Sequence, residues 1–165
     1  MTTPTRALIL IDVQQEYFAG PLTIQYPAPS DSLAKITAAI DAATASGIPI
    51  VVVQHTGGDE APLFNPTTSG FATHPDVVSR QDATWHAIVK EYSSVFPGTG
   101  LLDWLREGQI DTITLVGYMT NNCILATAAE AETHGIAVEV LSDATGAISL
   151  ANAAGVVDAR VVHET

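Results

Sequence analysis

The chain has 165 residues, enough to bury a hydrophobic core, and we expect residues 1–165 to form a single domain. Six Lys and Arg residues against eighteen Asp and Glu give a formal net charge of −12, and the cations are scattered. Nucleic acids and anionic membranes are therefore excluded as expected partners, because both bind clustered cations. A single cysteine excludes an internal disulfide framework and fits a reducing compartment.

The first apolar run of the chain predicts a strand. Asp12 interrupts this run early, and no small-residue cleavage site follows it, so it is not typical of a signal peptide. No apolar segment approaches the ~20 residues that cross a membrane. We therefore expect a cytoplasmic protein.

Apolar runs alternate with amphipathic stretches along the rest of the sequence. Residues 56–84 are rich in Gly, Pro and Thr and predict a long irregular loop. The predicted strands are residues 6–13, 48–55, 86–92, 111–117 and 136–144. The predicted helices are residues 30–47, 98–108 and 121–135, with another beginning at 149.

This alternation predicts an α/β fold with three layers, in which helices cover both faces of a doubly wound, mostly parallel sheet of order 3-2-1-4-5. Ligands of such sheets bind at the carboxyl ends of the strands. Asp12, His55, Lys90 and Cys123 lie at or just beyond the ends of four predicted strands. Their convergence is the first indication of a site.

Cys123 is either a small buried hydrophobe or a nucleophile. It falls in the first predicted turn of a helix, where free N–H groups and the helix dipole favour an anion. There the thiol pKa can fall from ~8.5 toward or below neutrality, and the thiolate is the reactive form. The free N–H groups could also hold an oxyanion.

Asp12 and Lys90 also have two interpretations each. Asp12 could cap a turn, or it could face Cys123 across the crevice and exchange a proton with the thiol. Lys90 could be a solvated surface charge, or it could pair with Asp12 and the Cys123 thiolate.

Three blocks of sequence resemble the signature motifs of the isochorismatase-like cysteine hydrolases, which include nicotinamidases and N-carbamoylsarcosine amidohydrolase. These blocks are "ILIDVQQEYF", "VKEYSSVFPGTGLLDWL" and "VGYMTNNCILATAAEAETHGIAVEVLSDATGA". The D-x-Q element, the lysine before S-x-F-x-G-T and the G-x-x-T-x-x-C turn occur in the family's order. The resemblance implies a catalytic triad of Asp12, Lys90 and Cys123.

The same resemblance implies a cis peptide bond between Tyr118 and Met119, with the N–H groups of Met119 and Cys123 forming an oxyanion hole. It also places Tyr17 at an aromatic position that often packs on substrate, although Tyr17 could equally be a half-exposed loop aromatic. The residues proposed to line the substrate pocket are Gln14, Tyr17, His55, Trp85 and Tyr118; for Trp85, core packing is the alternative.

The sequence departs from the family pattern at two places. Nicotinamidases carry a D-x-H metal site, whereas "VVVQHTGGDEAPLF" retains only His55, so we expect no metal and doubt nicotinamide as substrate. Family members continue beyond a segment such as "ANAAGVVDARVVHE" into one more strand, whereas this sequence ends at Thr165, so we expect that strand to be missing from the sheet.

The expected function is hydrolysis of an amide or carbamoyl C–N bond of a small molecule, through a thioester on Cys123 and without a cofactor. One alternative is vinyl-ether hydrolysis of the isochorismatase type, which proceeds by protonation and uses no cysteine nucleophile. The alternative of another class is a non-catalytic binding or scaffold protein on the same fold. The resemblance also favours a homo-oligomer.

Overall fold

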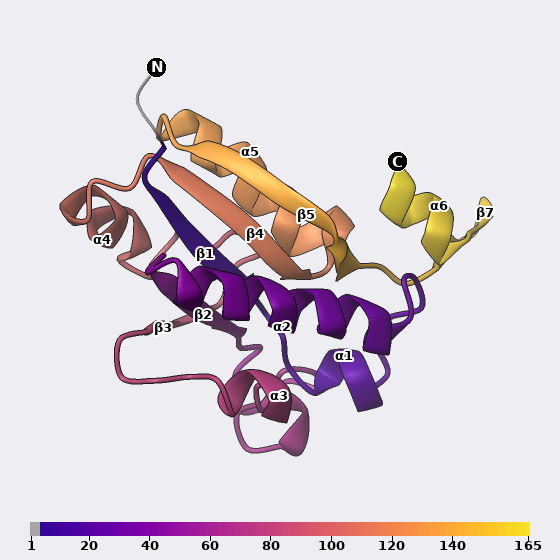
Figure 1. Ribbon diagram of the computed structural model, residues 1–165. Coiled ribbons are helices and arrows are strands. Elements are labelled where there is room, and N and C mark those ends of the chain that lie inside the picture. Colours follow the sequence, from indigo (N-terminus) through magenta and orange to yellow (C-terminus); the bar gives the residue numbers. More distant parts are fainter. Residues whose placement is uncertain (1–3) are drawn as a thin grey trace.

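Five parallel strands form the main sheet of the computed structural model, which describes residues 4–165 (Figure 1). They lie in the order β3-β2-β1-β4-β5, which confirms the predicted order. All four pairings are parallel, as expected when a crossover joins successive strands. The strands are β1 (Arg6–Ile11), β2 (Ile50–His55), β3 (His86–Lys90), β4 (Thr112–Tyr118) and β5 (Ala137–Gly146).

Helices cover both faces of this sheet (Figure 1). In β1, Leu8 and Leu10 belong to the core beneath α2, whereas Ile9 and Ile11 belong to the core beneath α4 and α5. This alternation follows from the two-residue period of a strand, and because both faces are covered the strand is apolar throughout. The main helices are α2 (Pro29–Ala45), α4 (Leu101–Glu107) and α5 (Leu125–Thr133).

Short elements fill the connections. The predicted loop 56–84 is mostly irregular but includes two single turns of helix, and another short helix follows Asp12. These elements are α1 (Glu16–Ala19), η1 (Ser69–Phe71) and α3 (Pro75–Val78). No helix in the described part of the chain has the length and hydropathy needed to cross a bilayer.

The helix predicted to begin at residue 149 is wrong for its first half. An antiparallel hairpin of β6 (Leu150–Asn152) and β7 (Gly155–Val157) occupies that stretch, and only α6 (Ala159–Glu164) is helical. The Asn152 side chain accepts a hydrogen bond from the Ala154 N–H (2.8 Å), and Gly155 has a φ of 145°. Asn and Gly in these positions favour a turn over a helix.

Gly117 allows β4 to approach β1 closely beside the predicted site. Its φ is 108°, and a Cβ at this position would meet the Ile11 carbonyl oxygen, one residue before Asp12. Gly135, after α5, also has a positive φ (73°), but a Cβ there would meet nothing within 4 Å. Substitution of Gly117 therefore tests both the positive φ and the close approach, whereas substitution of Gly135 tests the positive φ alone.

We predict that Gly117→Ala destabilises the fold by about 3 kcal/mol, because it adds a steric clash of ~1–3 kcal/mol to an unfavourable φ that costs ~1–2 kcal/mol. Gly135→Ala serves as the control and carries only the conformational cost, about 1 kcal/mol. Urea unfolding of the three proteins measures both values. Equal losses in the two variants would contradict the close approach.

Candidate active site

The carboxyl ends of β1, β3 and β4 bring three ionisable side chains together. Asp12 follows β1, Lys90 is the last residue of β3, and Cys123 lies in η2 (Thr120–Ile124), a π-helical turn after β4. All three are buried, with exposed fractions of 0%, 1% and 4%. Because β2 and β1 separate β3 from β4, only a side chain as long as lysine joins these strand ends.

Lys90 is the centre of this cluster. Its Nζ lies 2.8 Å from Oδ2 of Asp12 and donates a hydrogen bond to Sγ of Cys123 at 3.4 Å. It also donates to the carbonyl oxygen of Tyr92 (3.1 Å) and lies 3.4 Å from Nδ1 of His55. A buried ammonium is tolerated only with such partners, so these contacts stabilise it and fix its position.

The Asp12 carboxylate is held in an unusual environment. Its backbone is left-handed, with a φ of 52°, a conformation that Asp adopts more readily than most residues. Burial raises the pKa of Asp12 to about 6, although the Lys90 ammonium opposes that rise. Oδ1 has no donor at ordinary hydrogen-bond geometry within residues 4–165, although the Cys123 thiol is close enough to lower the pKa of Asp12 as a hydrogen-bond partner. The carboxyl group therefore has a pKa suited to proton transfer, with the thiol beside it.

The Cys123 thiol is less acidic than the sequence predicted. Burial raises its pKa to about 12, and the Asp12 charge adds to the rise, while Lys90 opposes it. The predicted pKa near or below neutrality is therefore wrong. Desolvation outweighs any lowering of the pKa by the helix start, because it disfavours a thiolate that is only 4% exposed. The resting group is a thiol, which can act as a nucleophile only if a neighbouring base takes its proton.

The turn between β4 and α5 presents the cysteine. The bond between Tyr118 and Met119 is cis, at the position where the family resemblance placed it. No hydrogen bond among residues 4–165 uses the Met119 N–H as donor. The Thr120 hydroxyl donates to Thr145 Oγ1 (3.0 Å) and lies 2.8 Å from Nδ1 of His163 in α6, so β5 and α6 brace this turn.

Gln14 and His55 form a second, supporting contact between β1 and β2. The Gln14 side chain accepts from the His55 N–H (2.8 Å) and donates to the His55 carbonyl (3.0 Å) and the Phe71 carbonyl (2.8 Å). Backbone groups thus occupy its amide, whereas the predicted role of Gln14 in the substrate pocket would require that amide to be free for substrate. The His55 ring lies beside Lys90, and burial with that nearby charge lowers the pKa of His55 to about 4.

Aromatic side chains line the α2 side of the site. The Tyr17 ring lies 5.3 Å from both Phe64 and Tyr118, and the pKa of Tyr17 is raised by burial and by the nearby Asp12 charge. The Tyr118 hydroxyl lies 2.8 Å from Ser32 Oγ in α2, so this predicted pocket residue is directed into the core. Sequence reasoning missed Phe64, whose signal was an aromatic residue within a loop of Gly and Pro.

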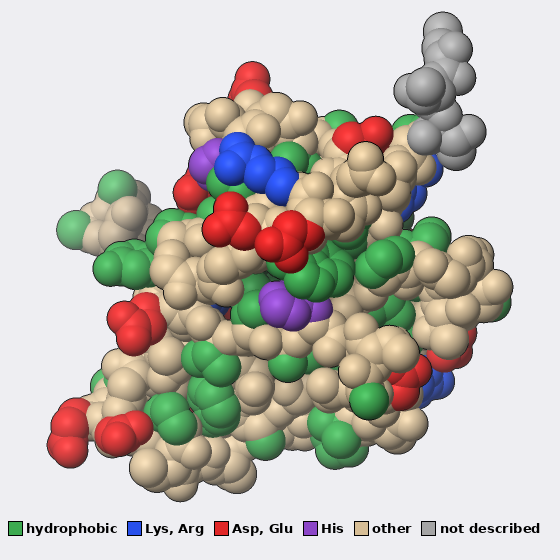
Figure 2. Space-filling view, turned by 90° about the vertical axis from the view of Figure 1, so that its left-hand side faces the viewer, with side chains coloured by type: hydrophobic (Ala, Val, Ile, Leu, Met, Phe, Trp, Pro, Cys, Tyr) green, Lys and Arg blue, Asp and Glu red, His purple; other side chains and the backbone are tan. Residues whose placement is uncertain are grey.

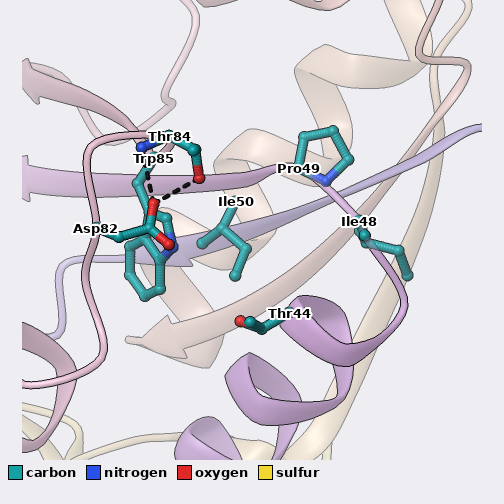
Figure 3. A pocket seen from close by; sticks show the side chains of 8 residues that line it. Thr44, Ile48, Pro49, Ile50, Asp82, Thr84 and Trp85 are labelled. Carbon is teal, nitrogen blue, oxygen red and sulfur yellow. Dashed lines mark hydrogen bonds between the residues drawn. The ribbon is translucent and has the colours of Figure 1, made fainter.

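Trp85 does not belong to the site. It directly precedes β3, whereas Lys90 ends that strand, so Trp85 lies at the amino ends of the strands and the candidate site at their carboxyl ends. Trp85 lines a pocket together with Ile48, Pro49 and Ile50, and Figure 3 shows its ring near Ile50, at the start of β2. Trp85 was predicted to line the pocket because it is near the 56–84 loop in sequence. That loop begins at the carboxyl end of β2 but reaches Trp85 only at the amino end of β3.

The remaining histidines have structural contacts. His74 Nδ1 accepts a hydrogen bond from the Asp76 N–H (3.2 Å) at the start of α3. The His86 ring stacks on Trp104, with centroids 4.9 Å apart and planes 8° apart. Within residues 4–165, no three His, Cys, Asp or Glu side chains are grouped as metal ligands would be.

A cavity of about 410 Å³ lies behind the partners of Lys90, although Asp12, Lys90 and Cys123 are not among its lining residues. His55 and Tyr92 form part of its wall, and both contact the Lys90 ammonium. The sequence could not reveal the role of Tyr92, because it is the backbone carbonyl that acts. The lining residues are His55, Thr56, Gly57, Gly58, Glu91 and Tyr92.

We predict that Lys90→Met destabilises the fold by about 3–5 kcal/mol at pH 8, because it leaves the Asp12 carboxylate buried without a counterion. Loss of the Lys90 ammonium raises the pKa of Asp12 further, above about 6. A group whose pKa is higher in the folded state loses stability as pH rises, so the penalty should shrink toward pH 4, where Asp12 is neutral. Urea unfolding at both pH values tests this, and adding Asp12→Asn should abolish the pH difference.

Comparison with known proteins agrees with this geometry. The Isochorismatase domain model matches residues 6–159. The structure of a candidate isochorismatase from Burkholderia xenovorans LB400 is 47% identical, with a TM-score of 0.94 over 99% of this chain and 77% of that chain. Nicotinamidase PncA from Bacillus subtilis is 25% identical, with a TM-score of 0.78 over 87% of each chain. N-carbamoylsarcosine amidase from Thermoplasma acidophilum is 25% identical, with a TM-score of 0.75 over 86% of this chain and 83% of that chain. The chain therefore belongs to the isochorismatase family and has its hydrolase fold.

Proposed function

We propose that this protein hydrolyses a C–N bond of a small amide or carbamoyl compound, with Cys123 as nucleophile. The observation that supports this most is the position of the Lys90 ammonium, which contacts both the Asp12 carboxylate and the Cys123 sulfur in a buried site. Nucleophile, base and an orienting cation within hydrogen-bond reach are the arrangement that covalent catalysis needs.

In the first half of the reaction, Asp12 takes the thiol proton as the Cys123 sulfur bonds to the carbonyl carbon. A thiol with a pKa of about 12 does not lose its proton to a carboxylate with a pKa of about 6 in the resting site. The transfer therefore takes place only while the new bond between sulfur and carbon forms. The N–H groups of Met119 and Cys123 stabilise the oxyanion. Asp12 then gives its proton to the leaving nitrogen, the C–N bond breaks, and a thioester remains.

In the second half, water enters the position of the leaving amine. Asp12 takes a proton from this water as its oxygen bonds to the thioester carbon, and the C–S bond then breaks. The sulfur leaves as the thiol once Asp12 returns the proton. Lys90 remains protonated throughout, holding the carboxylate near the sulfur and offsetting the charge that develops there.

Two relatives support the choice of bond. Nicotinamidase and N-carbamoylsarcosine amidase, both named for action on amide-type compounds, share the fold. Vinyl-ether hydrolysis proceeds by protonation and would leave the contact between Lys90 and the Cys123 sulfur without a role. Nicotinamide itself is not proposed, because the D-x-H element is missing after β2.

Trapping the thioester tests this proposal directly. Incubation with a panel of small amides should release ammonia and add the acyl group to the protein, and intact mass should assign the adduct to the one cysteine in the sequence. Cys123→Ala should abolish both signals. Undiminished ammonia release by this variant would contradict nucleophilic catalysis by Cys123.

The pH profile provides a second test. Because Asp12 acts as a base only when ionised, we predict that kcat/KM rises with pH through about 6 and then levels. Asp12→Asn should lower kcat/KM by about 10²–10⁴-fold. His55→Gln is the matched control: His55 has a pKa near 4, so this variant should keep the limb at about 6. Loss of that limb in His55→Gln would assign it to the histidine instead.

A further inference from the structure

Most cations of this chain form ion pairs with carboxylates. Besides the Lys90–Asp12 pair, four of the five remaining Lys and Arg side chains lie within 3.1 Å of an acidic oxygen. Arg106, the last of the six, is on α4. The four further pairs are Arg6–Glu139 (2.7 Å), Lys35–Asp143 (3.1 Å), Arg80–Asp41 (2.9 Å) and Arg160–Glu164 (3.0 Å).

Among the described residues, the cavity next to His55 and Tyr92 has no free positive charge in its lining. None of the six Lys and Arg lines it, and the Lys90 ammonium behind its wall is neutralised by Asp12. The His55 ring is uncharged at neutral pH, since its pKa is lowered to about 4. Figure 2 views another face of the molecule, on the side of α4, and shows few Lys and Arg side chains there.

Negative charge surrounds the same cavity. Glu91 is its one lining residue that is charged at neutral pH, and it is exposed to solvent. The chain continues from the lining residue Gly58 into exposed Asp59 and Glu60. A carboxylate that entered would lose water, find no cation and meet a like charge, so its burial would be unfavourable.

We propose that the site selects substrates by charge: it accepts small neutral or cationic amides, excludes those that carry a carboxylate, and uses Glu91 to set this preference. The inference rests on the proposed function, since it describes what approaches Cys123. Size acts with charge, because the cavity holds about 410 Å³ and the cysteine is only 4% exposed.

Alkylation of Cys123 tests the charge preference without any turnover. Iodoacetamide and iodoacetate have nearly the same size and differ by one negative charge. At low ionic strength, where exposed charges are least screened, we expect the iodoacetate to iodoacetamide rate ratio to be at least about five-fold lower in the folded protein than in the same chain unfolded in urea. Equal ratios would overturn the proposal.

Two charge reversals assign the effect to a position. Glu91→Lys should raise the relative rate of iodoacetate about five-fold, because it replaces a negative with a positive charge at the cavity. Glu107→Lys makes the same net change on α4, away from the cavity lining, and should leave the ratio unchanged. An equal rise in both variants would show that net charge, rather than Glu91, is responsible.

Hydrolysis of a matched panel separates this inference from the proposed function. Propionamide, glycinamide and succinamate present a neutral, a cationic and an anionic amide, and ammonia release reports each rate. Faster hydrolysis of succinamate would overturn the charge preference while leaving the hydrolase intact. Should none of the three react, the proposed function loses support, and the alkylation ratio still decides the charge preference.

Discussion

A buried ammonium is the constraint on which the rest of the site depends. Lys90 is 1% exposed, and its Nζ is satisfied by a carboxylate, a carbonyl oxygen, a sulfur and an imidazole nitrogen. Those partners come from the ends of β1 and β2, from the chain after β3 and from the turn after β4. One side chain thereby ties together segments that are distant in sequence, and any shift of a strand end would leave a charge unpaired in the interior.

The same burial decides where protons reside. Asp12 and Cys123 both have raised pKa values, of about 6 and about 12, because the interior disfavours either anion, and Lys90 offsets only part of this effect. The carboxylate is the anion that remains at neutral pH, and the sulfur stays protonated. The arrangement therefore resembles a base beside a masked nucleophile more than a preformed ion pair of thiolate and ammonium. Reactivity then depends on Asp12 taking the thiol proton as an electrophile reaches the sulfur.

Sequence patterns predicted the sheet order and the trio of Asp12, Lys90 and Cys123, because buried parallel strands are continuous apolar runs and their carboxyl ends meet. They failed where tertiary context decides. The sign of the Cys123 pKa shift depends on burial, which no local motif records. Trp85 was misplaced because nearness in sequence to a loop does not fix which edge of the sheet it reaches. The β6–β7 hairpin was missed because alanines around Asn152 suggested a helix, and turn chemistry outweighed propensity.

In the proposed reaction, positioning and specificity fall to two successive residues, Lys90 at the end of β3 and Glu91 directly after it. Lys90 is directed into the protein and orders the reacting groups, while Glu91, next in sequence, is exposed and lines the cavity. Glu91 comes directly after the last residue of β3, so it is not part of the buried cluster that Lys90 joins. A change at Glu91 can therefore alter the field that a substrate meets without disturbing the Asp12–Lys90–Cys123 contacts. Because the Lys90 ammonium and the Asp12 carboxylate offset each other while Cys123 is a thiol, the buried trio carries no net charge, so the charge preference proposed for the cavity depends on Glu91.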